Sequence, residues 1–131
     1  MIKGIGVDMV SISEMARHLE CDTENSAFER RTFTEAEREA ASKKHNKAEY
    51  YATRFAAKEA VTKAVAPLCP DADADLRIVE TLNRSDGAPY VSINERLGAI
   101  LNEVQIDTLH ISITTEGDNA TAFVVACGGE G

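Results

Sequence analysis

The stretch from Tyr50 to Leu68 constrains the fold more than any other part of the chain. It is rich in alanine and in straight-chain residues, which are the strongest helix formers. Because the residue before a proline is pushed out of helical geometry, Pro67 marks the end of the helical run. The sequence therefore predicts a long central helix, covering about residues 47–68, with the other elements arranged around it.

One face of this helix carries two charged side chains among alanines. At about 3.6 residues per turn, four residues fall on one stripe, namely Ala52, Ala56, Glu59 and Lys63. If this face packs against the protein, Glu59 could hold a cation and Lys63 an anion. If it faces solvent, the two form a surface pair at i,i+4 that contributes about 0.2–0.5 kcal/mol. The helix by itself favours the solvated pair.

The composition is that of an ordinary globular protein. The 131 residues suit one domain, residues 1–131, with a single core. No apolar run is long enough to span a membrane, and the N-terminus opens into a strand-like segment without a secretory pattern. The three cysteines are an odd number with no CxxC pair, which argues against disulfides and a zinc site. We therefore expect a cytoplasmic protein.

The charge is strongly negative but unevenly distributed. A net charge of −8 argues against a general nucleic-acid binder, which needs a basic surface to displace counterions. It does not argue against a phosphate ligand that is held locally. The basic run 43–47 lies just before the central helix, so positive potential could gather at the start of that helix. A solvated basic turn explains the same residues equally well.

The patterns on either side of the central helix indicate an α+β fold with antiparallel strands. Capping-box patterns begin helices at Ser11 and Thr34, and Asn94 can cap another. Asp86-Gly87 favours the positive φ of a tight hairpin. The expected strands cover residues 2–7, 76–82, 90–93, 110–115 and 120–126. The other expected helices cover residues 12–19, 27–31, 34–44 and 95–104, and loops are expected at 21–26 and 69–75.

Two carboxylates are placed where they could bind a metal. Asp8 follows the first expected strand, and Glu59 lies on the central helix. If they converge, two carboxylates together with substrate phosphate oxygens suit Mg²⁺, which usually keeps several waters. Arg54 and Lys63, from the same helix, are then available as cations for the phosphate. The sequence contains neither a Walker-type phosphate loop nor an HExxH zinc helix.

Several short motifs occur together in a specific order. They are Gly4-Ile5-Gly6-Val7-Asp8, Phe33-Thr34-Glu35, Arg54-Phe55-Ala56-Ala57-Lys58-Glu59-Ala60 followed by Lys63, Gly87-Ala88-Pro89 and Ile111-Ser112-Ile113-Thr114. In this order they resemble the holo-acyl-carrier-protein synthase family of 4'-phosphopantetheinyl transferases, in its short single-domain branch. The resemblance covers residues 2–126, and the KEA-xx-K block joined to the GxD opening is its most specific part.

The resemblance implies a fold, a reaction and an assembly. The expected fold is the 4'-phosphopantetheinyl transferase fold, with an antiparallel sheet and a long central helix. The expected reaction is the Mg²⁺-dependent transfer of phosphopantetheine from coenzyme A to a serine of an apo acyl carrier protein. It leaves adenosine 3',5'-bisphosphate as the second product and supports fatty acid biosynthesis. Family members of this length form trimers, with each active site between two subunits.

The resemblance also assigns roles to individual residues. Asp8 and Glu59 would hold the metal, and Glu59 and Lys63 would be catalytic, with Glu59 as the acceptor of the serine proton and Lys63 at the pyrophosphate. The coenzyme contacts that it implies are Arg54 at the phosphorylated ribose, Gly87 and Pro89 at the adenine end, and Lys58, Lys63, Ser112 and Thr115.

Two positions depart from the family pattern. Glu14 stands where the family often has an arginine that meets the acidic carrier protein, and Arg17 could substitute for it. Thr115 stands where the family often has a histidine, although its hydroxyl could still bond a phosphate. These departures leave open a non-catalytic module that binds coenzyme A or a carrier protein. A structural subunit with Glu59–Lys63 as a surface pair is a third alternative. Because Asp8, Glu59 and Lys63 are all present, we expect an active enzyme.

Overall fold

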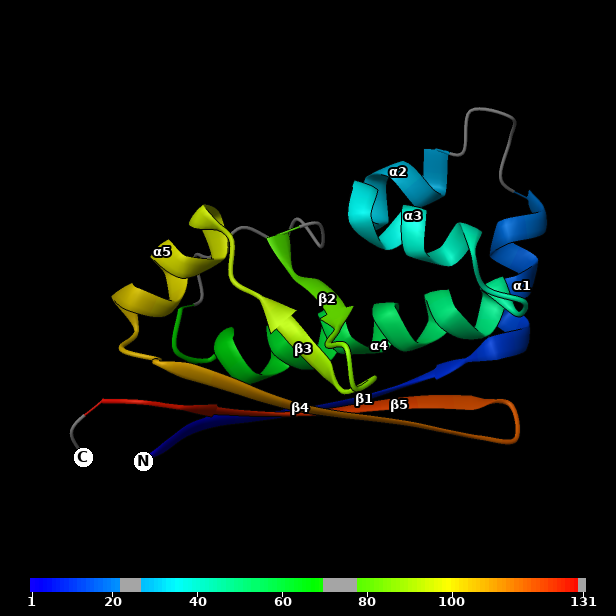
Figure 1. Ribbon diagram of the computed structural model, residues 1–131. Coiled ribbons are helices and arrows are strands. Elements are labelled where there is room, and N and C mark those ends of the chain that lie inside the picture. Colours follow the sequence, from blue (N-terminus) through cyan, green and yellow to red (C-terminus); the bar gives the residue numbers. More distant parts are fainter. Residues whose placement is uncertain (22–26, 70–77, 130–131) are drawn as a thin grey trace.

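The computed structural model describes residues 1–21, 27–69 and 78–129 (Figure 1). They form an α+β fold with antiparallel strand pairs, as the sequence predicts. The strands are β1 (Ile2–Ser11), β2 (Glu80–Asn83), β3 (Pro89–Ser92), β4 (Thr108–Glu116) and β5 (Asn119–Cys127). The helices are α1 (Ile12–Cys21), α2 (Ala27–Thr32), α3 (Glu35–Ser42), α4 (Lys47–Val65) and α5 (Glu95–Glu103). None of the helices in these ranges combines the length and the apolar character needed to cross a bilayer.

The three-stranded sheet has the order β1-β5-β4 and is covered on one face. Figure 1 shows α4 lying along that face, with α2, α3, α5 and the β2–β3 hairpin on the same side. Within the described ranges no helix covers the opposite face. The central helix predicted from the sequence therefore packs directly on the sheet, with the other elements arranged around it.

Glycines let α4 approach β1 very closely. Gly4 and Gly6 lie under the helix, and a methyl group on either would collide with the carbonyl oxygen of Ala64 or Ala60. Small residues on both elements therefore bring the two backbones together, since a glycine in a strand permits close approach of another backbone. This close approach sets the distance between β1 and the side chains that α4 directs towards it.

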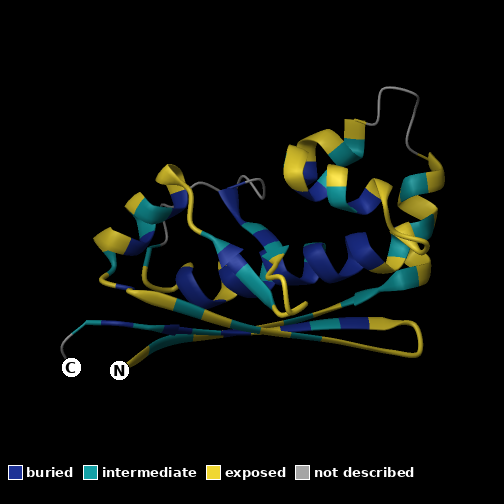
Figure 2. Ribbon diagram, in the orientation of Figure 1, coloured by how far each residue is buried: buried dark blue, intermediate teal, exposed yellow. Residues whose placement is uncertain are grey.

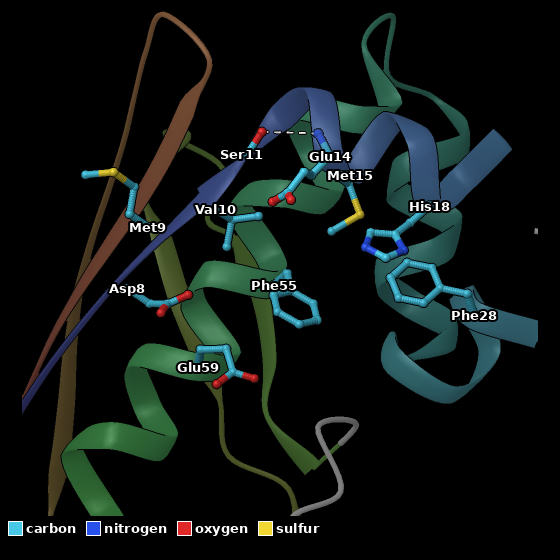
Figure 3. Close-up of a pocket in the computed structure, with 10 residues that line it drawn as sticks. All are labelled: Asp8, Met9, Val10, Ser11, Glu14, Met15, His18, Phe28, Phe55 and Glu59. Carbon is cyan, nitrogen blue, oxygen red and sulfur yellow. Dashed lines mark hydrogen bonds between the residues drawn. The ribbon is translucent and has the colours of Figure 1, made fainter. Parts of the chain in front are cut away.

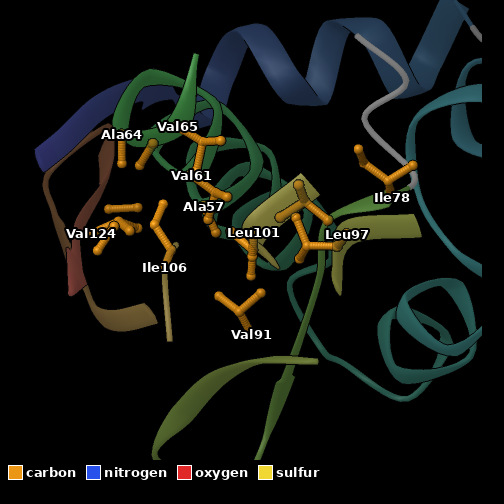
Figure 4. Close-up of a cluster of buried hydrophobic side chains, with 14 of the residues drawn as sticks. Ala57, Val61, Ala64, Val65, Ile78, Val91, Leu97, Leu101, Ile106 and Val124 are labelled. Atoms are coloured by element: carbon orange, nitrogen blue, oxygen red, sulfur yellow. The ribbon is translucent and has the colours of Figure 1, made fainter. Parts of the chain in front are cut away.

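The hydrophobic core lies between α4, the sheet and α5. Alternate residues of β5, from Ala120 to Ala126, are fully buried against the helix, whereas Phe123 between them is 46% exposed on the other face. Leu97 and Leu101 fix α5 to the same core (Figure 4), and burying a leucine contributes about 1.5–3 kcal/mol. Figure 2 shows that burial is concentrated in α4 and in alternate residues of β5.

The predicted helix starts and the predicted hairpins are confirmed. Thr34 and Glu37 form a complete capping box on α3, and Asn94 Oδ1 accepts a hydrogen bond from Leu97 N at 2.8 Å. Gly87 has a φ of 93° in the turn between β2 and β3. The expected loops at 21–26 and 69–75 and the start of the expected strand 76–82 lie mostly outside the described residues.

Most boundaries differ from the expectation by a few residues, and two of the differences bear on the site. β1 continues to Ser11, because it stays paired with β5 as far as Asn119, so Asp8 lies within the strand and not after it. α4 ends at Val65 with Ala66 as its C-cap, and residues 66–68 form a turn. The ending agrees with the effect of Pro67 on the residue before it.

Candidate active site

A pocket of about 450 Å³ lies where β1, α1 and α4 meet (Figure 3). Its polar lining consists of Asp8, Ser11, Glu14, His18 and Glu59, and its apolar lining of Met9, Val10, Met15, Phe28 and Phe55. Figure 3 shows Asp8 and Glu59 at one end of the pocket and the stacked rings of His18 and Phe28 at the other. The pocket therefore has a charged end and a largely apolar end.

Asp8 reaches the charged end because of its register in the sheet. It pairs with Ala122, whose side chain is fully buried against α4, so Asp8 lies on the covered face. Lys63 of α4 donates a hydrogen bond from Nζ to Asp8 Oδ1 at 2.9 Å and another to the carbonyl oxygen of Val7 at 3.2 Å. The side chain of Lys63 is 53% exposed and that of Asp8 18% exposed, which places this pair at the rim of the pocket.

Glu59 is the third charged group at this point. Partial burial raises the pKa of its carboxyl, the negative charge of Asp8 raises it further, and Lys63 lowers it. The pKa of the Lys63 ammonium is raised, chiefly by its hydrogen bond to Asp8 and by the charge of that carboxylate. The structure thus brings Asp8, Glu59 and Lys63 together, and the ion pair of Lys63 is with Asp8 and not with its helix neighbour Glu59.

The chemistry of these side chains fits a hard divalent cation. Asp8 and Glu59 are close enough to repel each other, while the lysine bonds to only one of them. Among the described residues, no group of three or more His, Cys, Asp or Glu side chains is arranged to hold a metal. A site with two protein carboxylates suits Mg²⁺, which commonly takes its remaining ligands from water and substrate phosphate.

The wall of the pocket is held in place by a residue that the sequence analysis missed. Asp118, in the turn between β4 and β5, accepts hydrogen bonds from the Oγ atoms of Ser11 (2.7 Å) and Ser13 (2.8 Å) and from Ser13 N (2.9 Å). These bonds lower the pKa of its carboxyl and fasten the start of α1 to the sheet. No sequence pattern indicates this contact, because the two segments are far apart along the chain.

Three predicted coenzyme contacts gather at the β2–β3 hairpin. Arg54 is almost completely buried, with its guanidinium 4.4 Å from the centre of the Tyr50 ring, and it donates a hydrogen bond to Asn83 Oδ1. Asn83 in turn donates to the carbonyl oxygen of Gly87 at 2.8 Å and is paired with Pro89. Arg54, Gly87 and Pro89 are thus linked through one asparagine, outside the pocket described above.

The predicted coenzyme contact of Lys58 stays a prediction, and in the structure this lysine has other partners. Its side chain is fully buried, and Nζ lies 2.6 Å from Glu37 Oε1 and donates to the carbonyl oxygen of Val79. The protein therefore encloses this lysine on all sides in the structure. Its position in the KEA-xx-K motif suggested a binding role, but successive helix residues point about 100° apart, so Lys58 faces away from Glu59.

Ser112 and Thr115 lie on opposite faces of the sheet. Ser112 pairs with Phe123 on the uncovered face, and Thr115 pairs with the buried Ala120 on the covered face. Both are exposed, and neither lines the pocket. Within one chain, a single bound coenzyme would therefore have to reach both faces of the sheet to contact both side chains.

Comparison with known proteins identifies the family. The sequence profile of the 4'-phosphopantetheinyl transferase superfamily (ACPS) matches residues 4–124. The chain belongs to this superfamily. The resemblance inferred from the motifs is therefore confirmed, and so is the fold that it implied.

Relatives and solved structures of this superfamily match over nearly the whole chain. A protein named holo-[acyl-carrier-protein] synthase from Wolbachia sp. subsp. Drosophila simulans (strain wRi) is 37% identical, covering 97% of this chain and 99% of its own. The crystal structure of the holo-[acyl-carrier-protein] synthase from Neisseria meningitidis has a TM-score of 0.85 at 33% identity, covering 96% of this chain and 98% of that one. A Chronobacterium ammoniagenes ACPS–CoA complex has a TM-score of 0.80 at 30% identity, covering 97% and 98%.

Proposed function

We propose that this chain transfers the 4'-phosphopantetheine group of coenzyme A to a serine hydroxyl of an apo acyl carrier protein. The products are the holo carrier protein and adenosine 3',5'-bisphosphate, and the reaction supports fatty acid biosynthesis. The observation that carries the proposal is the meeting of Asp8, Glu59 and Lys63 at one pocket, in a member of a phosphopantetheinyl transferase superfamily. The names of the relatives, and a family structure determined with coenzyme A, support it.

The charged end of the pocket supplies what phosphoryl transfer requires. Such reactions depend on positioning and on neutralising charge more than on covalent chemistry by the protein. Asp8 and Glu59 would hold Mg²⁺, which when bound would neutralise charge on the pyrophosphate. Lys63 places an ammonium at the same point and stabilises the departing phosphate. Glu59 accepts the proton of the carrier serine, and the raised pKa of its carboxyl makes it a stronger base for this task.

The protein works as a homotrimer with each site between two subunits. The uncovered face of the sheet exposes large apolar side chains, namely Ile2, Ile5, Val7, Met9 and Phe123. Monomers rarely expose a contiguous apolar surface of this kind, and a second copy of the chain suits it because it continues across β1 and β5. A subunit boundary also explains how residues on different faces of the sheet, such as Ser112 and Asp8, could serve one reaction.

The proposal also includes the domain that carries the activity and the compartment in which it takes place. Residues 1–131 act as one transferase domain, and the reaction takes place in the cytoplasm. The three cysteines, Cys21, Cys69 and Cys127, are free thiols, which agrees with a reducing compartment.

A transfer assay tests the function directly. The protein is mixed with coenzyme A, Mg²⁺ and an apo carrier protein, and the carrier is weighed by mass spectrometry. We expect a gain of one phosphopantetheine. Coenzyme binding without transfer to any of several carriers would contradict the enzyme and favour a binding module. This second candidate has support in Glu14, whose exposed carboxylate stands on the pocket wall where it would repel an acidic carrier.

The assembly is tested by a single charge on the uncovered face. Phe123→Lys places an ammonium in the apolar surface, and we expect light scattering to report monomers where the unmodified chain gives trimers. Asn102→Lys adds the same charge at an exposed position of α5, on the other side of the sheet, and serves as the control. A trimeric Phe123→Lys variant would show that this face is not the contact between subunits.

A further inference from the structure

We propose that the buried pair of Lys58 and Glu37 positions the β2–β3 hairpin on α4, and thereby sets the coenzyme end of the active site. The inference rests on the proposed function. It gives Lys58 a role that acts through other residues, in place of the direct coenzyme contact that its sequence motif suggested.

The pair is enclosed and fully engaged. Both side chains are 0% exposed, and Lys58 Nζ lies 2.6 Å from Glu37 Oε1. The same oxygen accepts a hydrogen bond from Thr34 N at 3.0 Å, and Oε2 accepts one from Thr81 N at 3.0 Å. Lys58 also donates to the carbonyl oxygen of Val79. One ion pair therefore joins the start of α3, the middle of α4 and the entry into β2.

The hairpin is attached to α4 at two successive helical turns. Lys58 holds its base through Val79 and, by way of Glu37, through Thr81. Arg54, one turn earlier on the same side of the helix, holds the other end of β2 through Asn83. The predicted contacts for the coenzyme, which are Arg54, Gly87 and Pro89, all depend on this second attachment.

Stability alone does not account for a buried ion pair. Replacing such a pair by apolar residues of similar volume is often neutral or stabilising, because the cost of desolvating two charges offsets their attraction. What the charges add is direction, since their hydrogen bonds fix where the backbone of β2 must lie. Glu59 faces the pocket on another side of α4 and touches none of these partners. Loss of the pair should therefore impair coenzyme binding while leaving the chemistry at Asp8, Glu59 and Lys63 intact.

The test is the double variant Glu37→Met/Lys58→Met, which removes both charges and keeps the volume. The measurements are the affinity for adenosine 3',5'-bisphosphate by calorimetry, and kcat and KM for coenzyme A and for the carrier protein, all well below Tm. We expect the affinity for the nucleotide to fall, and KM for coenzyme A to rise, by about tenfold, because a loosened support misplaces a binding group. KM for the carrier protein and kcat should stay within about twofold.

Two controls isolate the effect. Glu39→Met/Lys43→Met removes an exposed pair of the same residue types from the end of α3 and should change none of these quantities. Thr34→Ala removes the hydroxyl that caps α3 through Glu37 N but leaves the buried pair, and it should also leave coenzyme affinity unchanged.

Each outcome decides the inference. A folded double variant with unchanged coenzyme affinity, or with equal losses for coenzyme and carrier, overturns it. If the double variant does not fold, Glu37→Gln removes only the charge, and normal coenzyme affinity in that variant overturns the inference equally well. Absence of transfer by the unmodified protein would count against the proposed function instead, so the two failures are distinct.

Discussion

Lys58 and Lys63 project from the same helix and form ion pairs in opposite surroundings. Lys58 and Glu37 are shut away from solvent and share their remaining hydrogen-bonding capacity with backbone groups. Lys63 and Asp8 lie at the rim of a pocket, with half of the lysine exposed and another carboxylate, Glu59, beside them. Sequence motifs treat both lysines as one block, but the fold gives them different tasks.

The comparison shows that the fold is rigid around Lys58 and leaves the charge of Lys63 accessible. If one partner of a buried ion pair is lost, the other charge is left buried and unpaired, which costs several kcal/mol. The pair therefore keeps its geometry. Separating an exposed ion pair at the rim of the pocket costs little free energy, because water can replace either partner. Lys63 can therefore exchange Asp8 for a phosphate oxygen, whereas Lys58 cannot leave Glu37. Substitutions on one side of α4 at a time can therefore distinguish the roles of the two ion pairs.

The largest effect is expected at the rim side. Glu59→Gln keeps the size of the side chain but removes the charge and the base, so we expect transfer to fall by at least about 100-fold. Its dependence on Mg²⁺ should weaken, while the thermal unfolding transition is retained. The rate of phosphopantetheine gain by the carrier, followed by mass, measures this. Glu103→Gln, on the exposed surface of α5, is the matched control. Near-normal turnover in the Glu59→Gln variant would contradict both roles given to Glu59.

The next effect sets the two lysines directly against each other. Lys58→Met leaves the carboxylate of Glu37 buried without its counter-charge, and we expect it to lower the free energy of unfolding by about 3 kcal/mol. For a domain of this length that is a fall in Tm of about 10 °C. Lys63→Met should leave Tm nearly unchanged while it reduces transfer. Calorimetry and the transfer assay, applied to both variants, provide the comparison. Equal losses of stability in the two variants would remove the distinction between the pairs.

Local sequence patterns predicted several features of the structure. The capping box of Thr34 and Glu37, the turn at Gly87 and the ending of α4 near Pro67 follow from residues close to them in sequence. The identity of the family followed from the order of short motifs. The close approach that brings Asp8 towards α4 depends on Gly4 and Gly6, which alternate with apolar residues in the sequence.

Contacts between distant segments could not be predicted in this way. A helix pattern does not say which neighbour each face meets, so the sequence could not show that Lys58 pairs with Glu37. The length of β1 depends on pairing with β5, which the expected strand boundary at residue 7 could not anticipate. The clamp formed by Asp118 likewise exists only once the β4–β5 turn meets α1.

A smaller effect is expected on metal affinity. In the structure Lys63 supplies the positive charge that Asp8 bonds to, so a cation and this ammonium compete for the same carboxylate. Lys63→Met should therefore raise the affinity for Mg²⁺ a few-fold in the absence of coenzyme, although it impairs transfer. Titration calorimetry, or competition with Mn²⁺ followed by electron paramagnetic resonance, measures this binding. Weaker Mg²⁺ binding in the variant would mean that Lys63 helps to form the metal site and does not compete with the metal for Asp8.

The smallest effect concerns Asp118, which is exposed like the rim pair but has hydroxyl and amide donors as partners. Hydrogen bonds from Ser11 and Ser13 lower the pKa of its carboxyl in the folded protein. A lowered folded pKa stabilises the fold above the unfolded value, about 3.9, and this stabilisation is lost as the pH falls through the folded value. Asp118→Asn should thus lower Tm slightly at pH 6, and the difference should shrink as the pH falls below the unfolded pKa and through the folded one. Asp107→Asn, which alters an exposed carboxyl outside the clamp, should show no such convergence. A Tm difference that stays constant with pH would mean that the conformation of the turn, and not the charge of Asp118, stabilises the contact with α1.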